Sequence, residues 1–179
     1  MDKNGKRKRG IIMKFFKDWI VPVVCAVVIA FLINKFLIFK VEVPSGSMIP
    51  TVMIGDQIFV RKVYNTSKIE RGDIVVFKKD GKKELLLKRV IGLPGENVEV
   101  KDGGNVYING VFLDEPYVEN PDALTGIFTV PMDSYLMMGD NRKNSEDARM
   151  WKEPYISEKN IIAKAGLRIY PFNSIGFLE

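Results

Sequence analysis

Residues 73–92 are DIVVFKKDGKKELLLKRVIG, two apolar runs separated by a polar tip built on Asp80-Gly81. Each run is short and rich in branched aliphatic residues, which is typical of a β-strand, and Asp-Gly is a frequent hairpin turn. The lysines of the tip are most simply a solvated face. The stretch therefore predicts an antiparallel β-hairpin.

Similar segments continue on both sides of this hairpin. FVRKVY precedes it, and NVEVKD, NVYING, VFLDE, SYLMMGD and AGLRIYPF follow it, separated by Gly, Asp or Asn. Asn109-Gly110 is a second strong hairpin signal. After residue 40 no helical period is sustained, and MWKEPYISEKNI has room for one short turn or helix. The fold class is therefore mainly β, with an antiparallel β-sheet.

A turn-rich segment interrupts these strands. Gly92-Leu93-Pro94-Gly95 ends one strand in a Pro-Gly turn, and residues 97–131 contain the Asn109-Gly110 hairpin. We expect a β-domain formed by residues 41–96 and 132–179, with a small β-hairpin insertion at 97–131.

Residues 19–39, WIVPVVCAVVIAFLINKFLIF, form the longest apolar run. About 20 residues at ~1.5 Å each cross a hydrocarbon core of ~30 Å. A cleaved signal peptide is the competing interpretation, because Ile20–Ile33 has the length of its apolar region. Bulky residues stand where a cleavage site needs small ones, and Ser45-Gly46-Ser47 lies too far along the chain. We expect a single N-terminal transmembrane anchor that is not cleaved.

The positive charge of the chain is concentrated before this run. The chain carries a net charge of +5, yet residues 1–18 hold seven Lys/Arg against two Asp, and residues 41–179 hold 18 Lys/Arg against 20 Asp/Glu. This asymmetry predicts a basic cytoplasmic tail at 1–18, a plasma-membrane anchor, and a folded part on the outer face. It also argues against a nucleic-acid-binding surface on the folded part.

Two residue types are nearly or wholly missing. Cys25, inside the apolar run, is the only cysteine, and the chain has no histidine. Disulfides are therefore excluded from the folded part, as are Cys/His metal clusters and a Ser-His-Asp triad. We predict no metal and no cofactor.

Residues 43–51, VPSGSMIPT, offer two candidate nucleophiles, Ser45 and Ser47. The motifs G-x-S-x-G and S-x-x-K are absent, but a lysine from a distant strand can serve as the base of a Ser-Lys dyad. Such a lysine must be neutral, with a pKa lowered by burial from ~10.4 to about 7–8.

Lys88 meets this requirement. On a strand it shares a face with Leu86 and Val90, both apolar. Lys62 and Lys164 also lie in strand-like stretches and remain alternatives. Any of the three could instead be an exposed lysine on a sheet edge.

Residues 139–149, GDNRKNSEDAR, form a third candidate element. Their charge density suits an ordinary surface loop. However, they directly follow the apolar strand SYLMM, where a loop can reach into a site. There Asn and Ser could hydrogen-bond a catalytic group, and Asp–Arg pairs could brace the loop.

Together these segments resemble type I signal peptidases, membrane-anchored serine proteases that remove signal peptides from exported proteins. The resemblance covers the tail, the anchor and five motifs in the order of the family: PSGSMIPT (44–51), GD (55–56), RGDIVVF (71–77), KRVIGLPGE (88–96) and GDNRKNSEDAR (139–149).

The resemblance implies a role for each candidate. Ser47 is the nucleophile and Lys88 the general base, while the hydroxyl of Ser45 and the amide of Ser47 form the oxyanion hole. Residues similar to those that orient the base and brace the site are Ser145, Asp147, Arg149, Asp140 and Arg142. Ala148 stands where the family often has Ser.

The implied substrates are exported preproteins with small residues at the first and third positions before the cut. We expect them to bind extended, along Val43–Ser45 and Leu86–Lys88. The predicted substrate-binding residues are Val43, Pro44, Met48, Leu86 and Leu87.

Two alternatives use the same features differently. A self-cleaving repressor also has Ser and Lys on a β-fold, but it needs a DNA-binding segment where this chain has its apolar run. A non-catalytic membrane-anchored β-module that binds exported proteins would not need both Ser47 and Lys88.

Overall fold

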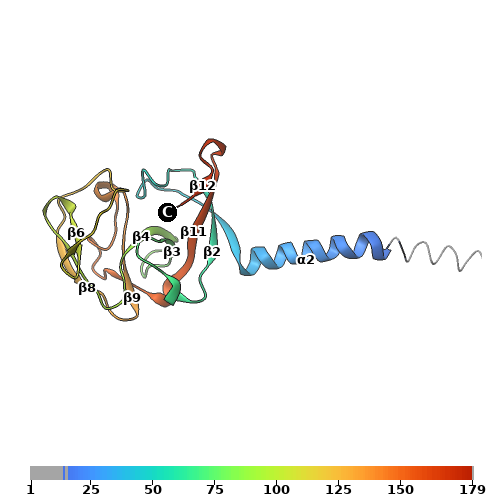
Figure 1. Ribbon diagram of the computed structural model, residues 1–179, viewed down its shortest axis with the longest axis horizontal. Coiled ribbons are helices and arrows are strands. Elements are labelled where there is room, and N and C mark those ends of the chain that lie inside the picture. The colour runs from blue at the N-terminus through green and yellow to red at the C-terminus, as the bar shows by residue number, and fades with distance from the viewer. Residues whose placement is uncertain (1–13, 15, 179) are drawn as a thin grey trace, which may run out of the picture. The chain divides into compact units, whose positions relative to one another are not determined.

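The N-terminal part of the described chain is helical. The computed structural model describes Lys14 and residues 16–178, apart from the side chain of Asp102. A π-helical turn, η1 (Phe16–Ile20), leads into helix α2 (Val21–Phe36), drawn in blue in Figure 1. Phe16–Phe36 spans 21 residues and contains an 18-residue window with a mean hydropathy of 2.2, which by length and composition is enough to cross a membrane. The basic residues 1–13 lie outside the described part.

The helix ends earlier than the expected 19–39. Strand β1 (Ile38–Glu42) begins two residues after Phe36, so Ile38 and Phe39 belong to a sheet. The reason is a change of period: along β1, Phe39 and Val41 are half-buried and pack on the core, whereas Lys40 is exposed. A mean hydropathy over the whole apolar run does not detect this alternation.

Most strands from residue 39 onward join one eight-stranded sheet. Its order is β1, β2 (Gln57–Lys62), β11 (Ile161–Tyr170), β3 (Ile74–Phe77), β4 (Leu86–Gly92), β9 (Ser134–Met138) and β10 (Tyr155–Ser157), and β12 (Gly176–Phe177) pairs with β11. Every pair from β2 to β10 is antiparallel. The hairpin expected at 73–92 is confirmed, with Val75 opposite Lys88 in the β3–β4 pair.

A smaller antiparallel sheet has the order β7 (Val111–Phe112), β6 (Val106–Ile108), β5 (Asn97–Val100) and β8 (Gly126–Thr129). At its turn Asn109 and Gly110 have φ of 50° and 83°, the left-handed conformation that a two-residue hairpin needs. The predicted β6–β7 hairpin is therefore confirmed. These four strands lie within residues 97–129. That residues 97–131 form an insertion within a larger β-domain remains a prediction.

The remaining regular elements are short 3-10 turns, and the fold class is confirmed as mainly antiparallel β with one N-terminal apolar helix. The turns are η2 (Thr66–Lys68), η3 (Asp102–Gly104), η4 (Arg142–Asn144), η5 (Glu158–Asn160) and η6 (Phe172–Ser174). Within MWKEPYISEKNI the chain forms β10 and then η5, which agrees with the single short turn expected there.

Strand β4 touches all three hydrophobic clusters of the core. Leu87 packs on a cluster around Val43, Met48 and Val60. Ile91 belongs to a second cluster, and Val90 and Leu86 to a third. Because neighbours on both faces fix β4, its side chains, Lys88 among them, have little freedom to move.

Candidate active site

Lys88 and Ser47 meet in the interior. Ser47 comes from the loop that follows β1, and Lys88 comes from the middle of β4. The Lys88 Nζ lies 2.5 Å from the Ser47 Oγ, and the two residues are only 4% and 7% exposed. The other candidate lysines are engaged elsewhere: Lys164 is paired with Asp73, and Lys62 lies over the Phe39 ring.

The environment of Lys88 favours the neutral amine. Burial lowers the pKa of Lys88 from 10.5 to about 8. The negative charges of Asp147, Glu146 and Asp140 act in the opposite direction and keep the pKa from falling further. A lysine with a pKa near 8 is partly neutral at physiological pH, as a general base must be.

Asn141 holds the loop that carries Ser47. Its side-chain amide donates to the carbonyl of Gly46 at 2.9 Å, and its backbone N–H donates to the carbonyl of Ser47 at 3.1 Å. Gly139 lies against the same loop, and a Cβ there would overlap both the Ser47 carbonyl oxygen and the Ser145 Oγ. The sequence suggested that an Asn of residues 139–149 could hydrogen-bond a catalytic group; Asn141 instead bonds the backbone of the loop that carries Ser47.

The two other candidate serines differ in exposure. Ser45 is exposed and lines the space beside Ser47. Ser145 is buried, and within residues 16–178 its Oγ has no hydrogen-bond partner, so it does not bond Lys88 Nζ. It is nevertheless close enough to Asp147 to help lower the pKa of that carboxyl.

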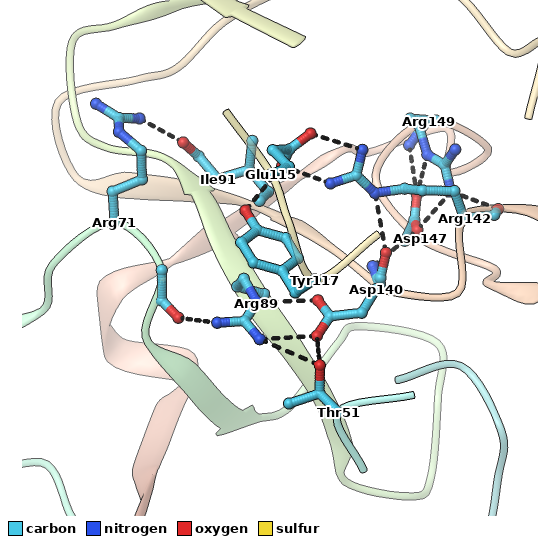
Figure 2. Close-up of polar contacts among 12 residues, drawn as sticks. Thr51, Arg71, Arg89, Ile91, Glu115, Tyr117, Asp140, Arg142, Asp147 and Arg149 are labelled. Carbon is cyan, nitrogen blue, oxygen red and sulfur yellow. Dashed lines mark hydrogen bonds and ion pairs between the residues drawn. The ribbon is translucent and has the colours of Figure 1, made fainter. Parts of the chain in front are cut away.

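Asp140 belongs to a buried ion pair beneath the Ser47 loop. Its carboxylate accepts two hydrogen bonds from Arg89, at 2.9 and 2.8 Å, and one from Thr51 at 2.5 Å (Figure 2). The Arg89 guanidinium also donates to the Gly72 carbonyl and lies 3.9 Å from the centre of the Tyr117 ring. This pair connects β4 to the segment that follows β9.

Asp147 and Arg149 form a second pair. Arg149 donates to both carboxylate oxygens of Asp147 at 2.8 Å, and Asp147 also accepts the Gly139 N–H. Burial alone would raise the pKa of Asp147, but the hydrogen bonds and charge of Arg149 outweigh it and lower the pKa. Arg149 also reaches Asp122 at 2.7 Å.

Arg142 pairs with a carboxylate that the sequence did not indicate. It donates twice to Glu115, at 3.0 and 2.6 Å (Figure 2). Glu115, Tyr117 and Asp122 all come from the irregular segment between β7 and β8. Of the four charged residues expected to brace the site, Asp147 and Arg149 pair with each other, whereas Asp140 and Arg142 have partners elsewhere in the chain.

Two clefts meet at Ser47 and Lys88. The first, of about 420 Å³, runs between residues 41–48 and 84–88, and its lining includes all five predicted substrate-binding residues, Val43, Pro44, Met48, Leu86 and Leu87. The second, of about 470 Å³, continues past Ser47 toward Lys82, Asn144, Glu146 and Trp151. An extended chain lying through both would pass the Ser47 hydroxyl.

The sequence of this chain has counterparts among known proteins. Residues 16–170 match the family model described as signal peptidase, peptidase S26. The chain belongs to the signal peptidase family S26. This confirms the resemblance drawn from the motifs.

Individual relatives agree with this family. Signal peptidase I of Leptolyngbya laminosa is 42% identical over 86% of this chain and 79% of the relative. Signal peptidase I P of Bacillus subtilis subsp. natto is 37% identical over 97% of each. A crystal structure of a signal peptidase I from Enterococcus faecalis is 34% identical and covers 52% of this chain and 93% of that one, with a TM-score of 0.45.

Ala148, where the resemblance led us to expect Ser, is 1% exposed and packs in the cluster of Ile91, Leu136 and Met138. Its methyl group therefore fills core space next to the Asp147–Arg149 pair.

Proposed function

We propose that this protein is a membrane-anchored serine endopeptidase that removes N-terminal signal peptides from exported preproteins with a Ser47–Lys88 dyad. The observation that carries the proposal is the 2.5 Å contact between Lys88 Nζ and Ser47 Oγ inside the protein, with the pKa of Lys88 lowered to about 8. Family membership supports the substrate class.

In the first step, neutral Lys88 accepts the Ser47 hydroxyl proton as the oxygen attacks the scissile carbonyl. The resulting lysine ammonium then protonates the departing amine, so an acyl-enzyme on Ser47 remains. Lys88 is neutral again and activates the water that hydrolyses the ester. One buried amine thus serves both halves of the reaction.

The negative oxygen of each tetrahedral intermediate needs hydrogen-bond donors. We assign the Ser47 backbone N–H and the Ser45 hydroxyl to this role. Support comes from their positions, because Ser45 lines both clefts at the point where Ser47 lies. Asn141 positions this loop through the carbonyls of Gly46 and Ser47.

Ser145 is assigned to orienting the base. Its Oγ is buried beside Gly139 and has no partner within the described residues, so it is available to a lysine ammonium as the proton moves. The pairs made by Asp147, Arg149, Asp140 and Arg142 keep residues 139–149 against the Ser47 loop.

The signal peptide would occupy the first cleft in an extended conformation. Val43 and Met48 are 5% and 1% exposed and leave little depth below the chain. Small residues at the first and third positions before the cut fit such a floor, whereas large ones do not. The segments on either side, residues 43–45 and 86–88, offer backbone groups for β-type pairing.

The anchor would place this site where signal peptides leave the membrane. Phe16–Phe36 has the length and apolarity of a single span. Basic residues at 1–18 favour a cytoplasmic N-terminus, with the catalytic part on the outer face of the plasma membrane.

Cleavage of a preprotein by the full chain in detergent tests this function. For a preprotein with an Ala-x-Ala segment at the end of its signal peptide, we expect a single cut directly after the second Ala. Leu in place of either Ala should block this cut. Ser47→Ala should be inactive and folded by circular dichroism. A folded wild-type protein that binds the preprotein without cutting it would favour the non-catalytic β-module.

A further inference from the structure

The second cleft is bridged by an ion pair between its two walls. Lys82, on the loop between β3 and β4, lies 2.8 Å from a carboxylate oxygen of Glu146, on the segment after β9. Both residues line the cleft beside Ser47. Their side chains are 37% and 57% exposed, so an incoming chain can reach either charge.

The loop that carries Lys82 is positively charged. Residues 78–85 include four lysines against Asp80 and Glu84. Lys79 ties the loop to the opposite wall, since its ammonium lies 4.6 Å from the centre of the Trp151 ring and donates to the Glu153 carbonyl. This wall of the second cleft therefore has an excess of positive charge. Of the four lysines in residues 78–85, Lys82 is the one that lines the cleft.

The proposed function fixes what passes through this cleft. If the residues before the cut occupy the first cleft, the residues after it must leave Ser47 through the second, because both clefts share that residue. The lining also differs in kind: apolar residues dominate the first cleft beyond Ser47, whereas the second is lined by the polar side chains of Lys82, Asn144 and Glu146. The first few residues of the mature protein would then lie against Lys82.

We propose that Lys82 is a specificity-determining residue for the mature side of the substrate, and that its ammonium binds an acidic side chain close after the cut in place of Glu146. In the free enzyme Glu146 neutralises Lys82. In the complex a substrate carboxylate replaces it, and a substrate ammonium meets the surplus of lysines instead. The inference rests on the proposed cleavage of preproteins.

Three preproteins that differ only at the second residue after the cut, Glu, Gln or Lys, test this inference. The wild-type protein should cleave the Glu form with a kcat/KM about two- to fivefold above the Gln form, the range that exposed ion pairs give. The Lys form should be the poorest. The preference should shrink between about 0.05 and about 0.5 M salt, because exposed charges are screened.

Variants test which residue causes this preference. For each variant we compare kcat/KM for the Glu form with kcat/KM for the Gln form at one pH. A change in the pKa of Lys88 affects both values equally and therefore leaves their ratio unchanged. Lys82→Gln should abolish the preference. Glu146→Gln should enlarge it, because it frees Lys82. Lys83→Gln, the same charge change one residue away and outside the cleft lining, is the matched control and should keep it.

A preference that survives Lys82→Gln, or that Lys83→Gln removes equally, would overturn the inference. Equal cleavage of all three preproteins by the wild-type protein would do the same and leave the proposed function standing. Failure to cleave any of them would overturn both.

Discussion

The pH dependence of cleavage follows from the pKa of Lys88. Burial lowers that pKa from 10.5 to about 8. Only the neutral amine accepts the Ser47 proton, so kcat/KM should follow its fraction, which is about 9% at pH 7, about 50% at pH 8 and about 91% at pH 9. Activity should therefore rise about fivefold from pH 7 to 8, about twofold from 8 to 9, and then level off.

A lysine with an ordinary pKa gives a different curve. With the value of 10.5, the neutral fraction and hence kcat/KM would rise about tenfold per pH unit through pH 9. The assay is kcat/KM for one preprotein from pH 6 to 10 in detergent, with folding checked at each pH. The position of the bend separates the two cases.

Glu146→Gln provides an internal check on the assignment. The negative charge of Glu146 raises the pKa of Lys88, so its removal should move the bend to lower pH. A flat profile from pH 6 to 10, or a tenfold rise per unit that continues past pH 9, would refute a buried lysine base.

Three further predictions concern stability and loop position. Lys88→Met should stabilise the full chain at pH 7 by up to about 3 kcal/mol, because a folded pKa below the unfolded one costs stability whenever the lysine is protonated in the unfolded state. This gain is complete below pH 8 and disappears as the pH rises toward 10.5. Asp140→Asn should destabilise by about 3–5 kcal/mol, because it leaves the guanidinium of Arg89 buried without its carboxylate. Asn141→Ala should lower kcat by roughly tenfold or more with a small loss of stability, because the Gly46 carbonyl loses its donor and the Ser47 loop shifts.

Urea unfolding of the detergent-solubilised protein measures the first two changes, and initial cleavage rates measure the third. Asp80→Asn on the exposed hairpin tip is the control for Asp140→Asn and should stay within about 0.5 kcal/mol of wild type. A Lys88→Met variant less stable than wild type at pH 7, an Asp140→Asn variant as stable as Asp80→Asn, or an unchanged kcat for Asn141→Ala would each contradict its prediction.

Local patterns were sufficient for the parts of the fold that depend on neighbouring residues. The period-two alternation of β4 indicated a lysine among apolar neighbours, and Lys88 is indeed buried there. Asn109-Gly110 predicted its hairpin, because few other residues adopt left-handed φ at both turn positions. The order of the motifs indicated the family, and the match of residues 16–170 to the family model confirms it.

Long-range charge pairing could not be predicted in the same way. Arg89 and Asp140 are 51 positions apart, and Arg142 and Glu115 are 27 apart. Glu115 lies in an irregular segment whose sequence has no period to show which way a side chain points. The end of the helix was missed for a related reason: Ile38 and Phe39 are as apolar as the helix, and only pairing of β1 with β2 separates them from it.

Removal of the Lys88 amine tests the dyad most directly. Lys88→Ala should reduce kcat/KM for a preprotein at pH 9 by at least the ~10²–10⁴-fold that a general base contributes, with the fold retained by circular dichroism and cooperative unfolding. Ser47→Ala, assayed beside it, sets the background. A folded Lys88→Ala protein that keeps more than about a tenth of wild-type activity, far above that range, would contradict the assignment of Lys88 as the base.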